Sequence, residues 1–397
     1  MAMDAGLRRS RLSAVRREEE RVTPLELFFD LVFVLAITQC TTLMAAQPTW
    51  EGLARGGLVL GVLWWSWVGY AWLTSVIDPE EGAVRLAMFA AMAALLVVSL
   101  CVPDAFDGLA LAFAIGYAVV RVAHIALFLL ASRDDPALRK SVIGLAVSTA
   151  VGSGLLVGAS FLHGTAQEAL WAVALGLDMA GPFFFGAQGW RLVPGHFAER
   201  HGLIVIIALG ESIVSIGVGA EGGVTAGVAT AAVLGMAVAA GMWWVYFDVA
   251  AIAVAARLSG TAAGQSQNEL ARDAYSYLHF PMVLGIVLVA LGLKITLAHV
   301  AEPLEAVPAV ALLGGVALYL LGQVAFKYRS LGSLTRVRLL LAAALLALLP
   351  AARHVDALVT LALVAVLLAA LVAFERIRYA TTREQVRHEH APAPRPP

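Results

Sequence analysis

The sequence predicts an all-α fold, a polytopic transmembrane helix bundle of about 12 helices arranged as a parallel 6+6 internal repeat. Composition and hydropathy predict the bundle. The 397 residues are 60% hydrophobic and only 14% charged, whereas roughly a quarter of the residues of a soluble domain are charged. Apolar runs of about 20 residues, long enough to cross ~30 Å of hydrocarbon, recur from Leu25 onward.

The predicted helices follow one another with short polar connections, and the first has a clear start signal. Thr23 at the N-cap, Pro24 at the first helical position and Glu26 at the third form a capping box. The predicted helices span residues 24–45, 53–76, 80–102, 108–131, 137–161, 166–187, 201–219, 225–248, 274–298, 304–326, 335–350 and 355–377.

The distribution of basic residues predicts the orientation in the membrane. With the N-terminus in the cytoplasm, 23 of the 27 Lys and Arg residues fall in inside segments, Arg200 and Arg338 among them, and only Arg55 and Arg353 fall in outside loops. Cytoplasmic loops carry the excess of positive charge. The chain is therefore predicted to be a multi-pass protein of the bacterial cytoplasmic (inner) membrane, with both termini in the cytoplasm.

Paired tryptophans predict the internal repeat. Trp64-Trp65 in the second predicted helix matches Trp243-Trp244 in the eighth, six helices further on. Because six is an even number of crossings, the two halves would share one orientation. The alternative, that apolar helices resemble one another through composition alone, stays open.

The repeat and the tails give the predicted domain boundaries. The first six-helix half is expected at residues 23–194 and the second at 195–378, joined by the loop at 188–200. Residues 1–22 are expected to form a cytoplasmic N-terminal tail. Residues 379–397, which end in a proline-rich stretch, are expected to form a disordered cytoplasmic tail.

Ionisable side chains inside the predicted spans are the candidate functional residues. An ionised group at mid-bilayer costs about 2.5–3.5 kcal/mol on insertion scales, so such a group marks a functional or paired position. The candidates for a proton, ion or substrate site are Asp30, Glu211, Asp178, Arg121, Glu26, Asp248, His124 and His279. Each also has a structural explanation, and the sequence leaves both open.

Among the carboxylates, Glu26 is the third residue of the capping box, but it also shares a helix face with Asp30 four residues later. Asp30 has no capping role. Glu211 is expected ~15 Å from the start of its helix, near the midplane, with small residues around it. Asp248 falls close to a helix end, where the membrane interface alone would explain it.

The basic candidates have structural alternatives as well. Arg121 is expected at mid-membrane, either in a functional site or as the structural counter-ion of Asp178 or Glu211. His124 and His279 are either proton carriers or hydrogen-bonded core histidines.

Three segments of the chain resemble the bacterial low temperature requirement protein A family. They are Glu-Leu-Phe-Phe-Asp-Leu-Val-Phe at residues 26–33, His-Gly-Leu-Ile-Val-Ile-Ile-Ala-Leu-Gly-Glu-Ser at residues 201–212, and Trp-Trp-Val-Tyr-Phe-Asp at residues 243–248. With the helix pattern between them, the likeness covers residues 22–375. It implies a polytopic membrane protein of a family whose molecular activity is not established, and it places Glu26, Asp30, Glu211 and Asp248 within family motifs.

The sequence favours a proton- or cation-coupled secondary transporter that uses buried carboxylates. The alternative is a membrane-embedded enzyme or sensor linked to lipids or cold adaptation, although HExxH, GxSxG, P-loop and Rossmann motifs are all missing. The two cysteines give neither a disulfide framework nor a metal pattern, and no cofactor is predicted. The expected partners are the lipid bilayer and protons, cations or a small solute. Near-neutral net charge argues against nucleic acid, and homo-oligomerisation is left open.

Overall fold

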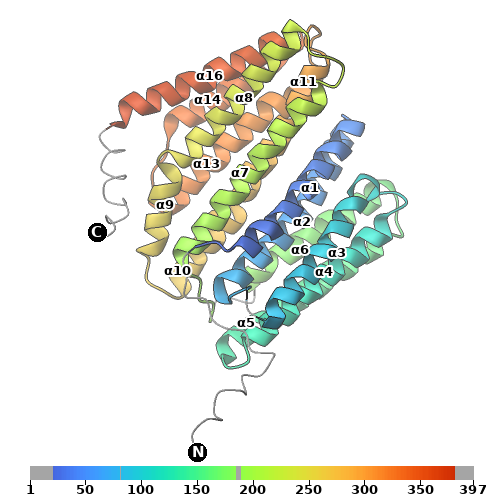
Figure 1. Cartoon of the computed structure of the whole chain (residues 1–397), viewed down its shortest axis with the longest axis vertical. Coiled ribbons are helices and arrows are strands. Elements are labelled where there is room, and N and C mark those ends of the chain that lie inside the picture. Colours follow the sequence, from blue (N-terminus) through green and yellow to red (C-terminus); the bar gives the residue numbers. More distant parts are fainter. Residues whose placement is uncertain (1–20, 81, 185–188, 381–397) are drawn as a thin grey trace, which may run out of the picture. The chain divides into compact units, whose positions relative to one another are not determined.

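The computed structural model describes residues 21–80, 82–184 and 189–380, and these residues form an all-α protein (Figure 1). Within them, ten helical segments are long and apolar enough to cross a membrane. The predicted tails at 1–22 and 379–397 fall almost entirely outside the described residues. The chain divides into two compact units, and the division falls within α7, between Arg200 and His201.

Of the described residues, the first unit contains 21–43, 51–80, 82–184, 189–200 and 262–269. Its helices are α1 (Pro24–Ala46), α2 (Trp50–Val76), α3 (Gly82–Cys101), a 3-10 turn (Val102–Asp104), α4 (Ala110–Ala131), α5 (Pro136–Ala159), α6 (Gly164–Phe184) and the start of α7 (Pro194–Gly219). The helices α3 to α6 pack one against the next (Figure 1). Almost every side chain of α2 from Val59 to Val76 is buried, so α2 is an inner helix of this unit.

Of the described residues, the second unit contains 44–50, 201–261 and 270–380. It includes α8 (Ala226–Phe247), α9 (Ala250–Ser259), a π-helix (Ala271–Tyr277), α11 (His279–Ala298), α12 (Ala306–Ala309), a second π-helix (Val310–Gly314), α13 (Gly315–Leu331), α14 (Arg336–Ala347), α15 (Leu349–Ala352) and α16 (Ala357–Arg378). The short α10 (Gln265–Leu270) lies at the boundary between the units.

Glycines bring α11 and α13 into close contact. A Cβ atom added to Gly285 would lie 2.7 Å from the carbonyl oxygen of Gly315, and one added to Gly292 would lie 2.7 Å from the Cβ atom of Leu312. Small residues at such positions let two membrane helices approach backbone to backbone. The core of the second unit therefore depends on close helix packing.

Each of the twelve predicted segments contains a helix, but the structure differs from the prediction at several places. The helix predicted at 201–219 begins at Pro194, because proline is favoured in the first helical turn, so the prediction that this proline lies in a loop is wrong. The helices α9 and α10 were not predicted. The segment at 335–350 breaks into α14 and α15, and neither it nor α6 is among the ten candidate spans.

Candidate functional site

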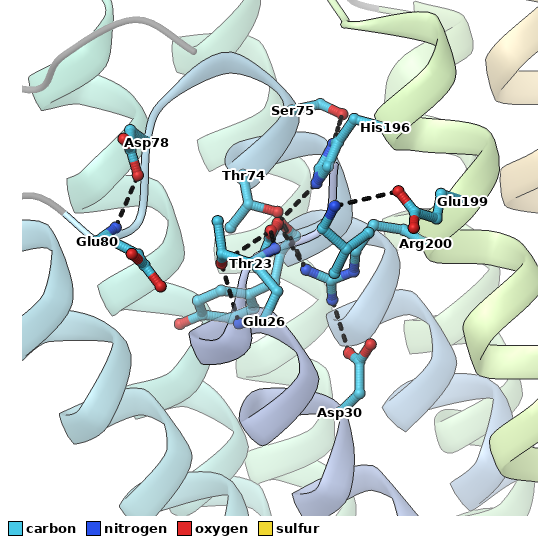
Figure 2. A network of polar contacts seen from close by, with 12 residues as sticks. Thr23, Glu26, Asp30, Thr74, Ser75, Asp78, Glu80, His196, Glu199 and Arg200 are labelled. Atoms are coloured by element: carbon cyan, nitrogen blue, oxygen red, sulfur yellow. Dashed lines mark hydrogen bonds and ion pairs between the residues drawn. The ribbon is translucent and has the colours of Figure 1, made fainter. Parts of the chain in front are cut away.

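The charged network of the first unit lies where the first turns of α1 and α7 meet the last turn of α2 (Figure 2). It consists of Glu26 and Asp30 on α1 and His196 and Arg200 on α7. All four side chains are completely buried. Each helix begins with a proline and places its two network residues at the third and seventh positions, so on each helix the two side chains lie on one face.

Glu26 is both a helix cap and an ion-pair partner. Its Oε2 atom accepts hydrogen bonds from the backbone amide of Thr23 at 2.9 Å and from the Thr23 hydroxyl at 3.1 Å, as the capping box predicts. Its Oε1 atom lies 2.9 Å from Nε2 of His196 and accepts a hydrogen bond from Nη1 of Arg200 at 3.0 Å. The two explanations of Glu26 that the sequence left open are thus compatible.

Arg200 also binds the second carboxylate. Its Nη2 atom donates to Oδ1 of Asp30 at 2.6 Å, and the same oxygen accepts a hydrogen bond from Nε1 of Trp67 at 2.9 Å. The guanidinium lies over the Trp67 ring, 5.6 Å from its centroid, and Nη1 also donates to the Thr74 hydroxyl at 3.2 Å. Oδ2 of Asp30 is buried and has no hydrogen-bond partner among the described residues. Oδ1 of Asp30 is therefore hydrogen-bonded to two side chains, whereas Oδ2 is not hydrogen-bonded to any described residue.

His196 connects Glu26 to α2. While Nε2 faces Glu26, Nδ1 lies 2.9 Å from the hydroxyl oxygen of Ser75, the second-last residue of α2 (Figure 2). Ser75, His196 and Glu26 therefore form a continuous series of hydrogen bonds between three helices.

The network has an uneven number of charges. Counted over its four side chains, two carboxylates face one guanidinium, so with a neutral His196 the net charge is −1. An unbalanced charge in a low-dielectric interior is unfavourable. One added proton makes the four side chains neutral, whether it resides on the histidine or on a carboxylate.

A second ion pair of the first unit joins α4, α5 and α6, and it is balanced. Nη2 of Arg121 donates to Oδ1 of Asp178 at 2.9 Å and to the Thr149 hydroxyl at 2.8 Å. The Tyr117 hydroxyl donates to the other oxygen of Asp178 at 3.2 Å. Of the two counter-ions considered for Arg121, the structure thus pairs it with Asp178.

His124 lies beside this ion pair. It is buried, with the Tyr70 and Phe128 rings at 5.4 and 5.0 Å. A Cβ atom added to Gly69 would lie 2.8 Å from Cε1 of His124 and 3.1 Å from Nη1 of Arg121. Glycine at this position therefore lets α2 pack against both side chains.

The remaining candidates belong to the second unit. Glu211 is 2% exposed, and its Oε1 atom accepts a hydrogen bond from the Ser215 hydroxyl at 3.1 Å. Because α7 begins at Pro194, Glu211 is the eighteenth of its 26 residues, so it lies further from the start of its helix than the predicted ~15 Å. Asp248 is the half-buried C-cap residue of α8.

His279 forms two hydrogen bonds. Its Nε2 atom lies 2.8 Å from the Tyr246 hydroxyl, and its Nδ1 atom lies 3.1 Å from the carbonyl oxygen of Ala274. A carbonyl only accepts, so Nδ1 carries a hydrogen and Nε2 accepts from tyrosine in the neutral ring. The carbonyl belongs to the π-helix before α11, so His279 ties this irregular turn to α8.

The structure brings together residues that the sequence analysis did not connect. Arg200 and Arg338 are predicted only as basic residues of inside segments, but both are buried, and Arg338 forms an ion pair with Glu375 at 2.8 Å. His196 was not singled out at all. A signal existed, because Pro194, His196 and Arg200 repeat the spacing of Pro24, Glu26 and Asp30. Among the described residues, no group of three His, Cys, Asp or Glu side chains is arranged to hold a metal ion.

Apolar helices with charged side chains buried among them define a polytopic α-helical membrane protein. The family model "Bacterial low temperature requirement A protein (LtrA)" matches residues 21–373, and the chain belongs to this family, as its motifs indicated. It is similar to an uncharacterized protein of Rhizobium meliloti (strain 1021), with 31% identity over 309 residues that cover 75% of each chain. No solved structure matches it.

Proposed function

We propose that the chain is a proton-coupled secondary transporter, and that the network of Glu26, Asp30, His196 and Arg200 binds the coupling proton. The observation that carries the proposal is the net charge of −1 over four completely buried side chains. Ionisable groups buried in membrane proteins mark ion and proton pathways. Here a single proton balances the charge, and Oδ2 of Asp30 can take it without breaking a hydrogen bond.

The arrangement favours a proton over a metal cation. Two carboxylates alone would suit a cation, but the guanidinium of Arg200 lies between them, at 3.0 Å from Glu26 and 2.6 Å from Asp30. The position that a metal ion would need is thus filled by a positive group of the protein itself.

Protonation also gives a way to couple the site to a conformational change. The ion pairs of Arg200 join the beginnings of α1 and α7. A proton on Asp30 removes the charge that strengthens one of these ion pairs. The ion pairs that join α1 and α7 are then weaker in the protonated state. A solute that binds one of the two conformations more tightly shifts the equilibrium between them.

The predicted parallel repeat fits this proposal. The helices α1 and α7 would be the first helices of the two six-helix halves at 23–194 and 195–378, and they share the spacing of a proline and two network residues. The proposed protein has twelve crossings, both termini in the cytoplasm, and the network at the cytoplasmic ends of its helices. Transporters commonly place coupling sites between repeats.

The test uses purified protein in liposomes on a solid-supported membrane. Charge movement is recorded while a panel of small solutes is applied with and without a pH gradient. A solute that gives a pH-dependent current identifies the substrate. D30N and E26Q should abolish that current. E168Q is the matched control, because Glu168 is a partly exposed ion-pair carboxylate of the same unit. Equal currents in D30N and wild type would remove Asp30 from the mechanism.

A membrane-embedded enzyme is the second candidate, and one observation favours it. Ser75, His196 and a carboxylate form a hydrogen-bonded series, as in hydrolases with an activated serine. Ser75 is only 1% exposed, however, and a nucleophile must reach its substrate. Covalent labelling of Ser75 by a lipophilic fluorophosphonate, lost in S75A, would support the enzyme over the transporter.

A further inference from the structure

We infer that His196, held between Ser75 and Glu26, is a second resting place for the network's proton. This inference rests on the proposed function, since it concerns the same network. The single proton that neutralises the four side chains then occupies either of two positions. One is His196, near the end of α2, and the other is Oδ2 of Asp30, one helical turn after Glu26 on α1.

The hydrogen bonds of His196 are compatible with both of its charge states. Ionised Glu26 only accepts, so Nε2 carries a hydrogen, and in the neutral ring Nδ1 accepts from the Ser75 hydroxyl. When Nδ1 gains a proton, the hydroxyl turns and becomes the acceptor. A hydroxyl can play either part. His196 therefore changes charge while both of its contacts stay in place.

The groups around His196 favour a proton at this position. Glu26 on α1 is the nearest carboxylate, at 2.9 Å, and Arg200 on α7 binds the same carboxylate oxygen. Ser75 and Thr74 of α2 carry no charge. Glu199, the neighbour of Arg200, is exposed. The positive charge of Arg200 is shared between Glu26 and Asp30.

Transfer of the proton from His196 to Glu26 requires no other reactant. An imidazolium gives its Nε2 proton to Oε1 of Glu26, so that one N–H bond breaks and one O–H bond forms, and the ring keeps its proton on Nδ1. The reverse step returns the proton. Asp78 and Glu80 are half-buried and follow Ser75 within five residues, and Oδ1 of Asp78 accepts a hydrogen bond from the backbone amide of Glu80 (Figure 2).

The other buried candidate histidines lack this arrangement. Among the described residues, neither His124 nor His279 contacts a carboxylate. His124 lies against aromatic rings and near Arg121, whose positive charge opposes a second one. His279 faces a carbonyl and a tyrosine hydroxyl. These two histidines therefore serve as internal controls.

The experiment is solution or solid-state NMR of the full chain, labelled with 15N in histidine and placed in lipid nanodiscs. The H196Q difference spectrum assigns the signals of His196. Between about pH 5 and pH 9, wild-type His196 should pass from an imidazolium to the neutral form with hydrogen on Nε2. In E26Q and in D30N the excess negative charge is gone, so His196 should bind its proton at least about tenfold more weakly. The His279 signals should not move.

A His196 that stays in one neutral form over this range, in wild type and in both variants, overturns the inference. So does a titration that neither E26Q nor D30N changes. Because each variant removes the excess charge independently, one that fails to fold leaves the other as the test.

The outcomes also separate this inference from the transport proposal. If His196 titrates as expected but no solute produces a current, the proton site stands and the transporter falls. If D30N abolishes a current while His196 never titrates, the transporter stands and Asp30 is its sole proton position.

Discussion

The two units fill their interiors in different ways. The interior of the first unit contains two sets of buried ionised groups, one around Arg200 and one around Arg121. In the second unit, α11 and α13 meet through glycines, and His279 and Tyr246 form a neutral hydrogen-bonded pair. The strong ion pair of that unit, Arg338 with Glu375, lies near helix ends. The second unit also buries Glu211 and Arg338, but α11 and α13 pack there through glycines, so the buried ion pairs of the first unit call for a separate explanation.

Within the first unit the two charged sets differ in turn. Arg121 and Asp178 are one cation and one anion, and both carboxylate oxygens are hydrogen-bonded. The network around Arg200 contains two carboxylates and one guanidinium, and Oδ2 of Asp30 accepts no hydrogen bond from the described residues. A balanced pair suits a structural role, and an unbalanced one suits proton binding. Substitutions that neutralise one carboxylate in each set separate these roles.

The largest loss of stability is expected for D178N. The substitution leaves the buried guanidinium of Arg121 without its counter-ion, and breaking a buried pair in this way costs about 3–5 kcal/mol. Thermal unfolding in detergent should show a clear drop. The double variant R121M/D178L removes both charges and should recover much of the loss. A single variant as stable as the wild type would show that this pair does not hold α4 and α6 together.

A smaller loss is expected for G285A in the second unit. The added methyl group would meet the carbonyl oxygen of Gly315 at 2.7 Å, and overpacking of this kind costs about 1–3 kcal/mol. G57A is the matched control, because nothing lies within 4 Å of a Cβ atom there. Equal unfolding temperatures for G285A and G57A would mean that close glycine packing does not stabilise the second unit.

Y246F should have a still smaller effect. The substitution removes the hydroxyl bound to Nε2 of His279 at 2.8 Å, which is a neutral hydrogen bond worth about 0.5–1.5 kcal/mol. Because Tyr246 and the neutral ring of His279 carry no charge, transport should be unchanged at every pH. A pH-dependent loss of current in Y246F would give the second unit a part in proton handling and would weaken the contrast between the units.

The sequence was sufficient for the helical segments and for half of the network. Hydropathy located every long helix, and the capping box placed Glu26 and Asp30 on one face of α1. Their partners were missed because the Pro194-Gly195 dipeptide resembles a loop, so Arg200 was predicted to lie in a cytoplasmic loop. The contacts themselves join residues about 170 positions apart. Periodicity along one helix cannot identify a partner on another, and for the same reason Asp178 and Glu211 stayed equal alternatives for Arg121.

The smallest effect on stability is expected for D30N, although it should abolish transport. Asparagine keeps an oxygen that accepts from Arg200 and Trp67, and the substitution removes the excess negative charge of the network. The weaker hydrogen bond and the relief of charge offset each other, so the unfolding free energy should change by no more than about 1 kcal/mol. The two Asp-to-Asn variants should therefore differ in stability: D178N unfolds easily, whereas D30N is as stable as the wild type but does not transport. If D30N were as unstable as D178N, both carboxylates would be structural counter-ions, and the charge imbalance around Arg200 would have no bearing on protons.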